Sequence, residues 1–387
     1  MPMRMKGTNI EVPAPTDKSA CGGYTGFNSL NPHEIFVCRR APARRSQIAH
    51  GFGKPVIQRM PNGDLVASQY KNLRSQRNPA YPNADEEAAL CFSRDEGLTW
   101  SAPRLLGLPG RATQLSVLKD AVMVLAAGSK LYWSDDAGES FHECDVKWDK
   151  FSRDKRPGVS RGFGETNGVL ELPDGTLLAT CCTVRGPVER YDDFQCYAIR
   201  SRDRGRTWED GNLIIETDEV ELLRLRDGRL LGFARLDTSY SRDVWGQGGQ
   251  TGEGGDQMAL IASSDEGRTW TKPSPIGLGM AQIPGFPLEL PDGRIVLIYG
   301  NRQFPFGCQA IGTRDHGKTW DLENFLMLAY ASWDNYGGHP RSILMPDGSV
   351  MTGYYARYFR ETPTVNEDIV SHCLRWNVPE DWPPERA

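Results

Sequence analysis

The octapeptide Ser-Arg-Asp-Glu-Gly-Leu-Thr-Trp at residues 93–100 recurs along the chain. It returns as SRDRGRTW at 201–208, SSDEGRTW at 263–270 and TRDHGKTW at 313–320, and in a weaker form as SDDAGESF at 134–141. In each copy the Asp can accept backbone N–H bonds, the Gly supplies a positive φ, and the last aromatic residue is suited to packing between sheets. We expect a structural turn rather than five catalytic carboxylates, because a turn on the rim of every repeat cannot converge on one substrate.

A second recurring phrase precedes most of these octapeptides. It is an apolar strand, an Asp-Gly or Asn-Gly turn, and another apolar strand. Both turn residues can adopt positive φ, so this pattern is the strongest short-range signal of a β-hairpin. The five hairpins read VIQRMPNGDLVA (56–67), VLELPDGTLLAT (169–180), LLRLRDGRLLGF (222–233), PLELPDGRIVLI (287–298) and SILMPDGSVMTG (342–353).

The hairpins and octapeptides together define one repeating sheet. A hairpin, the strand that runs into the octapeptide and one further strand make a four-stranded sheet that cannot bury its own faces. A less regular stretch at 114–138 raises the number of such units to six. Radial stacking buries the faces of such sheets. The sequence therefore predicts an all-β fold, a six-bladed β-propeller of four-stranded antiparallel blades. We expect one domain over 1–387, with residues 1–45 packing on or closing the propeller.

Composition excludes several other classes of protein. The 387 residues are 39% hydrophobic and 25% charged, as in globular proteins, and the net charge of -5 without a long Lys/Arg run argues against nucleic acid. No long apolar run predicts a membrane span or a signal peptide, so we expect a cytoplasmic protein, although a chain whose signal had been removed would look the same. The scattered cysteines and isolated histidines predict free thiols and neither a metal nor a cofactor.

The repeated octapeptide is similar to the Asp-box, also called the BNR repeat. Five copies over 93–320 resemble the sialidase superfamily of six-bladed propellers. The repeat implies the fold, whereas an activity depends on residues near the propeller axis. Because strands run outward from that axis, the residues nine before each turn glycine should occupy equivalent places close to it. These are Lys54, Thr166, Glu219, Pro284 and His339.

The fourth and sixth blades carry the resemblance to known sialidase residues. EVELLRLRDGRLLGFAR at 219–235 puts Glu219 where the family has its catalytic glutamate and Arg235 where it has a substrate-binding arginine. GHPRSILMPDG puts His339 at the place of the tyrosine nucleophile, and an imidazole cannot play that part in the same way. We expect these two blades to lie opposite, or nearly opposite, one another across the pore.

Departures from the family affect the arginines that bind a sugar carboxylate. The Arg-Ile-Pro phrase of the first blade is replaced by GFGKPVIQ, so that Lys54 offers a point charge in place of a planar fork. In the fifth blade the nearest arginine is Arg302 in YGNRQ.

Loops that enter the same face contain the remaining candidates. NPAYPNADEEAAL (78–90) lies where sialidases keep their acid/base aspartate, and we choose Asp85 from it. SRGFGETN (160–167) and SWDNYGGH (332–339) combine aromatic faces with carboxylates, which suits a sugar site. The full set of expected substrate-binding residues is Arg235, Lys54, Arg161, Glu165, Arg302, Tyr336 and Arg341.

Three functions follow as hypotheses, each with a glycan or small saccharide as partner. The first is an exo-acting glycoside hydrolase of the sialidase superfamily acting on an acidic or deoxy sugar. Asp85 would be its acid/base, Glu219 a base or the partner of a nucleophile, and His339 a proton-transfer group or substrate ligand.

The second hypothesis is a polysaccharide lyase acting on a uronate-containing glycan. His339 would be the base, and Arg341, Arg235 or Lys54 would neutralise the uronate carboxylate. The third is a non-catalytic carbohydrate-binding propeller. The sequence does not specify the sugar, the linkage or the oligomeric state.

Overall fold

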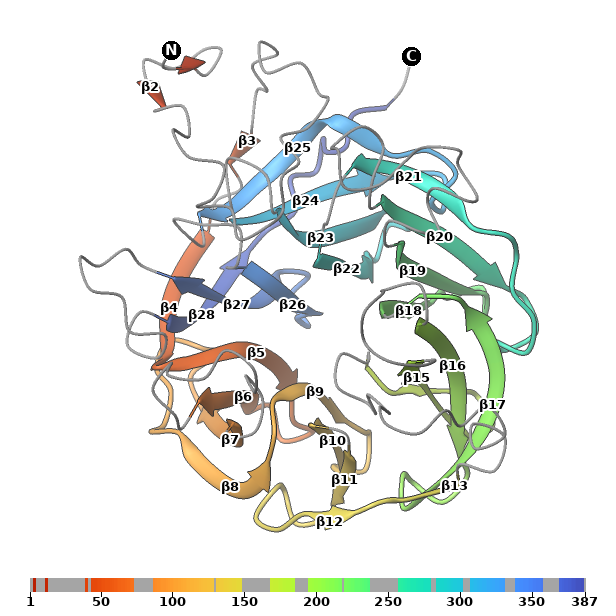
Figure 1. Ribbon diagram of the computed structural model, residues 1–387. Coiled ribbons are helices and arrows are strands. Elements are labelled where there is room, and N and C mark those ends of the chain that lie inside the picture. Colours follow the sequence, from red (N-terminus) through yellow and green to blue (C-terminus); the bar gives the residue numbers. More distant parts are fainter. Residues whose placement is uncertain are drawn as a thin grey trace.

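The computed structural model describes residues 3–4, 11–12, 39–40, 43–72, 86–128, 130–147, 168–184, 194–217, 219–236, 257–279, 283–301, 307–330, 338–357 and 369–385. All elements assigned within these ranges are β-strands. Six sheets stand around a common centre, and β1 (Met3–Arg4) and β2 (Glu11–Val12) form a separate pair (Figure 1). The predicted all-β, six-bladed propeller is confirmed.

The first three sheets follow the chain from the centre outward. Blade one contains β5 (Phe52–Arg59), β6 (Leu65–Asn72), β7 (Glu86–Ser93) and β8 (Arg104–Pro109). Blade two contains β9 (Ala112–Val117), β10 (Met123–Ala127), β11 (Lys130–Ser134) and β12 (His142–Glu143). Blade three contains β14 (Leu170–Glu171), β15 (Leu177–Val184), β16 (Phe194–Ser201) and β17 (Thr207–Ile215), with β13 (Asp145–Lys147) parallel to β17 at its edge.

The other three sheets complete the ring. Blade four contains β18 (Glu219–Arg224), β19 (Leu230–Leu236), β20 (Gln257–Ser263) and β21 (Ser274–Gly279). Blade five contains β22 (Ile283–Glu289), β23 (Ile295–Asn301), β24 (Gly307–Thr313) and β25 (Asp321–Tyr330), with β3 (Arg39–Arg40) parallel to β25. Blade six contains β26 (Gly338–Leu344), β27 (Val350–Arg357), β28 (Ile369–Trp376) and β4 (Ala43–His50).

The ring is closed by a strand from the other end of the chain. β4 pairs antiparallel with β28, with Ala43 opposite Trp376 and His50 opposite Val370. Blade six therefore combines three strands from the C-terminal part with one from the N-terminal part. That 1–387 forms a single domain stays a prediction, since it includes residues outside the described ranges.

The octapeptide turns are held by their own polar side chains. In the first copy, Thr99 donates to Asp95 through its backbone N–H at 2.9 Å and through Oγ1 at 2.6 Å, and the Gly97 N–H donates to Ser93 Oγ at 2.9 Å. Gly97 has the expected positive φ of 79°, and Glu96 before it also has a positive φ, 55°. The residue before the glycine has a positive φ in the other four copies too. The sequence predicted only one of these two left-handed residues.

The octapeptide carboxylates make the protein sensitive to acid. Hydrogen bonds from the Thr99 hydroxyl and backbone N–H lower the pKa of Asp95 to about 2. Between the ordinary Asp pKa and this value the unfolded chain binds more protons, so the stabilisation is complete above about pH 4 and is lost as pH falls toward 2. We expect Asp95→Asn to be less stable than the wild type at pH 7 and to show a shallower loss of stability from pH 4 to 2. Denaturant unfolding at several pH values measures both; equal slopes would contradict the assignment.

The ends of the strands lie on two opposite faces of the propeller. The hairpin turns and the octapeptides lie on one face, which we call the lower face; there Arg204 of an octapeptide contacts Asp120 of the blade-two hairpin turn at 2.5 Å. The inner strands β5, β9, β14, β18, β22 and β26 begin on the opposite face, which we call the upper face. The repeated carboxylates are thus remote from the strand starts, as a structural role requires.

The core consists of the interfaces between neighbouring blades. Trp208, the last residue of the octapeptide in blade three, is 0% exposed and packs in a cluster that includes Val124 of blade two and Leu177 of blade three. Its indole Nε1 donates to the Gly205 carbonyl oxygen at 2.9 Å. The large aromatic side chain thus fills the gap between two sheets while its one polar atom is satisfied within the turn.

Candidate active site at the start of the inner strands

The hairpin of blade four brings two of the predicted residues together. Glu219 begins β18 and lies opposite Arg235 in β19. Arg235 Nη1 donates to Glu219 Oε2 at 3.1 Å, and the two side chains are 9% and 6% exposed, respectively. A carboxylate buried this far needs a charged or hydrogen-bonding partner, since burying it without one costs several kcal/mol. Both residues were selected from the sequence as separate site residues, and their contact is a feature that only the structure gives.

Lys54 and His339 occupy the corresponding places in blades one and six with a different backbone. Both are left-handed, with φ of 48° and 46°, and each precedes a proline. The pairing register shifts at both places, between Gly53 and Val56 and between Gly338 and Arg341, as in a β-bulge. A left-handed residue other than glycine costs ~1–3 kcal/mol, and the others among the described residues lie in turns, whereas Lys54 and His339 lie within inner strands. In blade four the corresponding pairing is regular.

The imidazole of His339 rests on an aromatic ring that sequence reasoning missed. Its centroid lies 5.5 Å from that of Tyr355, with 24° between the planes. Tyr355 belongs to β27, pairs with Gly338 and is 0% exposed. It follows Gly348 by seven residues, as Arg235 follows Gly228, so the same spacing could have found it.

A second carboxylate lies near Glu219 and pairs across blades. Glu221 of β18, with a side chain 2% exposed, forms an ion pair with Arg341 of β26, whose guanidinium also lies over the Phe286 ring of β22 at 5.6 Å. Blade five alone separates blades four and six. The expectation that these two blades lie opposite one another was wrong, because in a ring of six the fourth blade faces the first.

The loop chosen for the acid/base ends in a fixed carboxylate. Glu86 begins β7 and receives hydrogen bonds from Arg111 Nη2 at 2.8 Å and Nε at 3.2 Å, while the Arg111 guanidinium lies 4.9 Å from the centroid of the Tyr70 ring. Glu87 accepts the backbone N–H of Gly107 at 2.8 Å. Two of the three acidic residues of this stretch thus have structural partners.

Several predicted residues cannot be assigned a position. Asp85, Arg161, Glu165, Arg302 and Tyr336 all lie outside the described residues. Their roles stay predictions. Among the predicted residues that the structure describes, Glu219 pairs with Arg235. Arg341 pairs with Glu221, a residue that the sequence analysis had not selected.

Comparison with known proteins gives matches of structure only. No protein-family model and no curated protein sequence matches the chain. A protein of unknown function from Dyadobacter fermentans has a TM-score of 0.65 at 17% identity, covering 88% of this chain and 99% of its own. The Trypanosoma rangeli sialidase in complex with sialic acid has a TM-score of 0.56 at 13% identity, over 88% of this chain and 60% of its own. An intramolecular trans-sialidase from Ruminococcus gnavus has 0.53 at 11%, over 86% and 97%.

The chain has the propeller fold of these sialidases. The similarity that the octapeptides implied is thus confirmed for the fold. At 11–17% identity it does not extend to the activity, which must be argued from the site.

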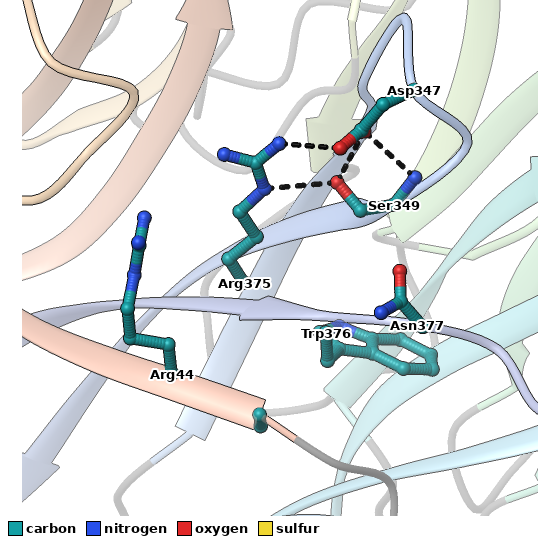
Figure 2. A pocket seen from close by; sticks show the side chains of 7 residues that line it. Arg44, Asp347, Ser349, Arg375, Trp376 and Asn377 are labelled. Carbon is teal, nitrogen blue, oxygen red and sulfur yellow. Dashed lines mark hydrogen bonds and ion pairs between the residues drawn. The ribbon is translucent and has the colours of Figure 1, made fainter.

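The sialidase-like propeller also has a cavity on its lower face, where the ring closes. It measures about 250 Å³ and is lined by Ala43, Arg44, Asp347, Ser349, Arg375, Trp376 and Asn377 (Figure 2). Arg375 crosses it and donates to Asp347 Oδ2 at 2.5 Å and Ser349 Oγ at 3.0 Å, and it also reaches Glu96 of blade one at 2.5 Å. These contacts join blade six to blade one, so we assign this cluster to ring closure.

Replacing Arg375 by Met is expected to weaken the closure. The two carboxylate partners are 64% (Glu96) and 55% (Asp347) exposed, so each ion pair contributes at most ~1 kcal/mol and is screened by salt. We expect the variant to lose ~0.5–1.5 kcal/mol in low salt and less in 1 M NaCl. Urea unfolding measures the loss. Arg44→Met is the control, since Arg44 donates to the Glu96 carbonyl oxygen over a long 3.5 Å, and an equal effect of both substitutions would contradict the assignment.

Within the described ranges, no group of three or more His, Cys, Asp or Glu side chains could hold a metal ion. No helix in that part of the chain is long and apolar enough to cross a membrane.

Proposed function

We propose that the sialidase-like propeller is an exo-acting glycoside hydrolase that removes an acidic or deoxy sugar from the end of a glycan. The observation that carries the proposal is the buried Glu219–Arg235 pair at the start of an inner strand. Desolvated ionic groups are costly to keep, and such groups near a propeller axis are typical of binding and catalytic sites. A sialidase with the same fold, from Trypanosoma rangeli, is known in complex with sialic acid.

The proposed reaction divides the work among four residues. Asp85 donates a proton to the leaving oxygen as the glycosidic bond breaks, and water supplies the hydroxyl group that ends on the anomeric carbon. Glu219 acts as a base or as the partner of a nucleophile. His339 transfers a proton or binds the sugar, and Arg235 holds an anionic or hydroxyl group of the substrate.

Elimination from a uronate is the second candidate, and the contacts favour it less. A lyase would need a cation beside His339 to neutralise the uronate carboxylate. Arg341 and Arg235, two of the three cations considered for this task, are each in an ion pair with a buried glutamate. Drawing Arg341 to the uronate would take it from Glu221, at a cost of ~3–5 kcal/mol. Arg235 would have to hold the carboxylate without leaving Glu219, as it does in the hydrolase.

The test is a screen of sialosides, rhamnosides and uronides with the purified protein. Hydrolysis releases reducing sugar without new ultraviolet absorbance, elimination produces an unsaturated uronide that absorbs, and a binding module gives neither product while still retaining the glycan. We expect reducing sugar from at least one acidic or deoxy glycoside. Retention of glycan without any product would refute the proposal in favour of the binding module, and an absorbing product would refute it in favour of the lyase.

A further inference from the structure

The ion pair between Glu221 and Arg341 lies on the same two inner strands as the proposed catalytic residues Glu219 and His339. Glu221 follows Glu219 by two residues in β18, and Arg341 follows His339 by two in β26. Each precedes the glycine of its hairpin turn by seven residues, as does Phe286 in blade five. The three side chains thus come from equivalent positions of three consecutive inner strands, and Arg341 contacts both of the others.

This contact differs from the other links in the propeller. β18 and β26 belong to different sheets, separated by blade five, so no backbone ladder connects them. The ion pair reaches past β22, with the Phe286 ring 5.6 Å from the Arg341 guanidinium. Its two ends, Glu221 and Arg341, are 2% and 13% exposed, so breaking the pair would leave two charges that are largely removed from water.

We propose that Glu221 and Arg341 are a positioning pair that fixes the separation between Glu219 and His339. This inference rests on the proposed function for its kinetic consequence. His339 has a left-handed backbone and lies in a bulge, where the regular hydrogen-bonded pairing of β26 with β27 is interrupted. The ion pair provides a second restraint on the position of β26. Misplacing a catalytic group by about 1 Å can lower the rate about 100-fold. An ion pair that holds the two strands at a fixed separation therefore affects the rate.

The test compares single variants with the exchanged pair. Glu221→Gln and Arg341→Met each break the ion pair, whereas Glu221→Arg combined with Arg341→Glu restores it with the charges reversed. The first readout is the ¹H–¹³Cε1 signal of the His339 imidazole, assigned by its loss in His339→Gln. It needs no substrate. We expect the signal to shift by more than its line width in both single variants and to return toward its wild-type position in the exchanged pair.

The second readout is the rate with the glycoside found in the screen. We expect kcat to fall about 10- to 100-fold in the single variants with KM nearly unchanged, and to recover at least tenfold in the exchanged pair. The matched control is Arg226→Met, which breaks another ion pair between blades, with Glu289 at the lower face. It should change neither readout.

Two outcomes would overturn the inference. One is a His339 signal that stays in place in both single variants; the other is an equal shift in the Arg226→Met control. If the protein hydrolyses no glycoside, the proposed function fails, yet the His339 signal still decides whether the pair positions that residue.

Discussion

Glu219→Gln is expected to lower kcat for glycoside hydrolysis by about 10²–10⁴-fold, the contribution usual for a general base. The amide keeps the shape of the side chain and an oxygen that can accept the Arg235 hydrogen bond, now 3.1 Å long. It cannot take up a proton or balance the positive charge of Arg235. The loss should therefore appear in kcat more than in KM. Initial rates with the glycoside found in the screen measure it.

A matched control separates chemistry from stability. Glu289 also lies in an inner strand, and its side chain, 10% exposed, pairs with Arg226 at 3.4 Å. It sits at the lower face, away from the strand starts. Glu289→Gln should leave kcat within about twofold of the wild type while removing a comparable ion pair. Full activity in Glu219→Gln, or equal losses in both variants, would remove Glu219 from the catalytic site.

Trp208→Ala is expected to cost about 3–5 kcal/mol of folding free energy, as for other large aromatic residues cut back in a core. The side chain is 0% exposed and fills the interface of blades two and three, so its removal leaves a cavity that rigid sheets close only in part. The hydrogen bond to the Gly205 carbonyl oxygen, 2.9 Å long, is lost as well.

Urea unfolding followed by circular dichroism measures this loss. Leu213, in the same strand as Trp208 but 42% exposed, provides the control: Leu213→Ala should change the free energy by less than about 0.5 kcal/mol. Trp208→Phe keeps part of the volume without the indole N–H and should fall between the two. A Trp208→Ala protein as stable as the Leu213→Ala protein would contradict the view that blade interfaces form the core.

The sequence predicted the features that are local to one hairpin. A turn glycine fixes which residues of its two strands face one another, so counting from Gly228 led to Glu219 and Arg235. Blade two was harder to recognise because its hairpin has Ala121 in place of glycine, and the structure gives this alanine the left-handed φ of 67° that the turn needs. The sequence pattern of this hairpin was therefore weaker, although its turn has the same left-handed backbone as the glycine turns of the other blades.

Features that depend on non-local geometry were beyond this reasoning. The bulges at Lys54 and His339 insert an extra residue without any change that counting from the glycine can detect. The pair Glu221–Arg341 depends on how far side chains reach between sheets, which no repeat encodes. Arg341 was predicted from the sequence as a substrate-binding residue, whereas Glu221 was not selected, since a glutamate in an inner strand looks like an ordinary surface charge.

The pairing of β4 with β28 has a consequence for synthesis. A ribosome makes residues 43–50 long before residues 369–376, so β4 has no β28 to pair with until that later segment has been made. Until then β4 keeps unpaired backbone groups that other chains could capture. A nascent polypeptide cut short before β28 would contain five blades, the β26–β27 hairpin and an unpaired β4, which is a species that chaperones and proteases recognise.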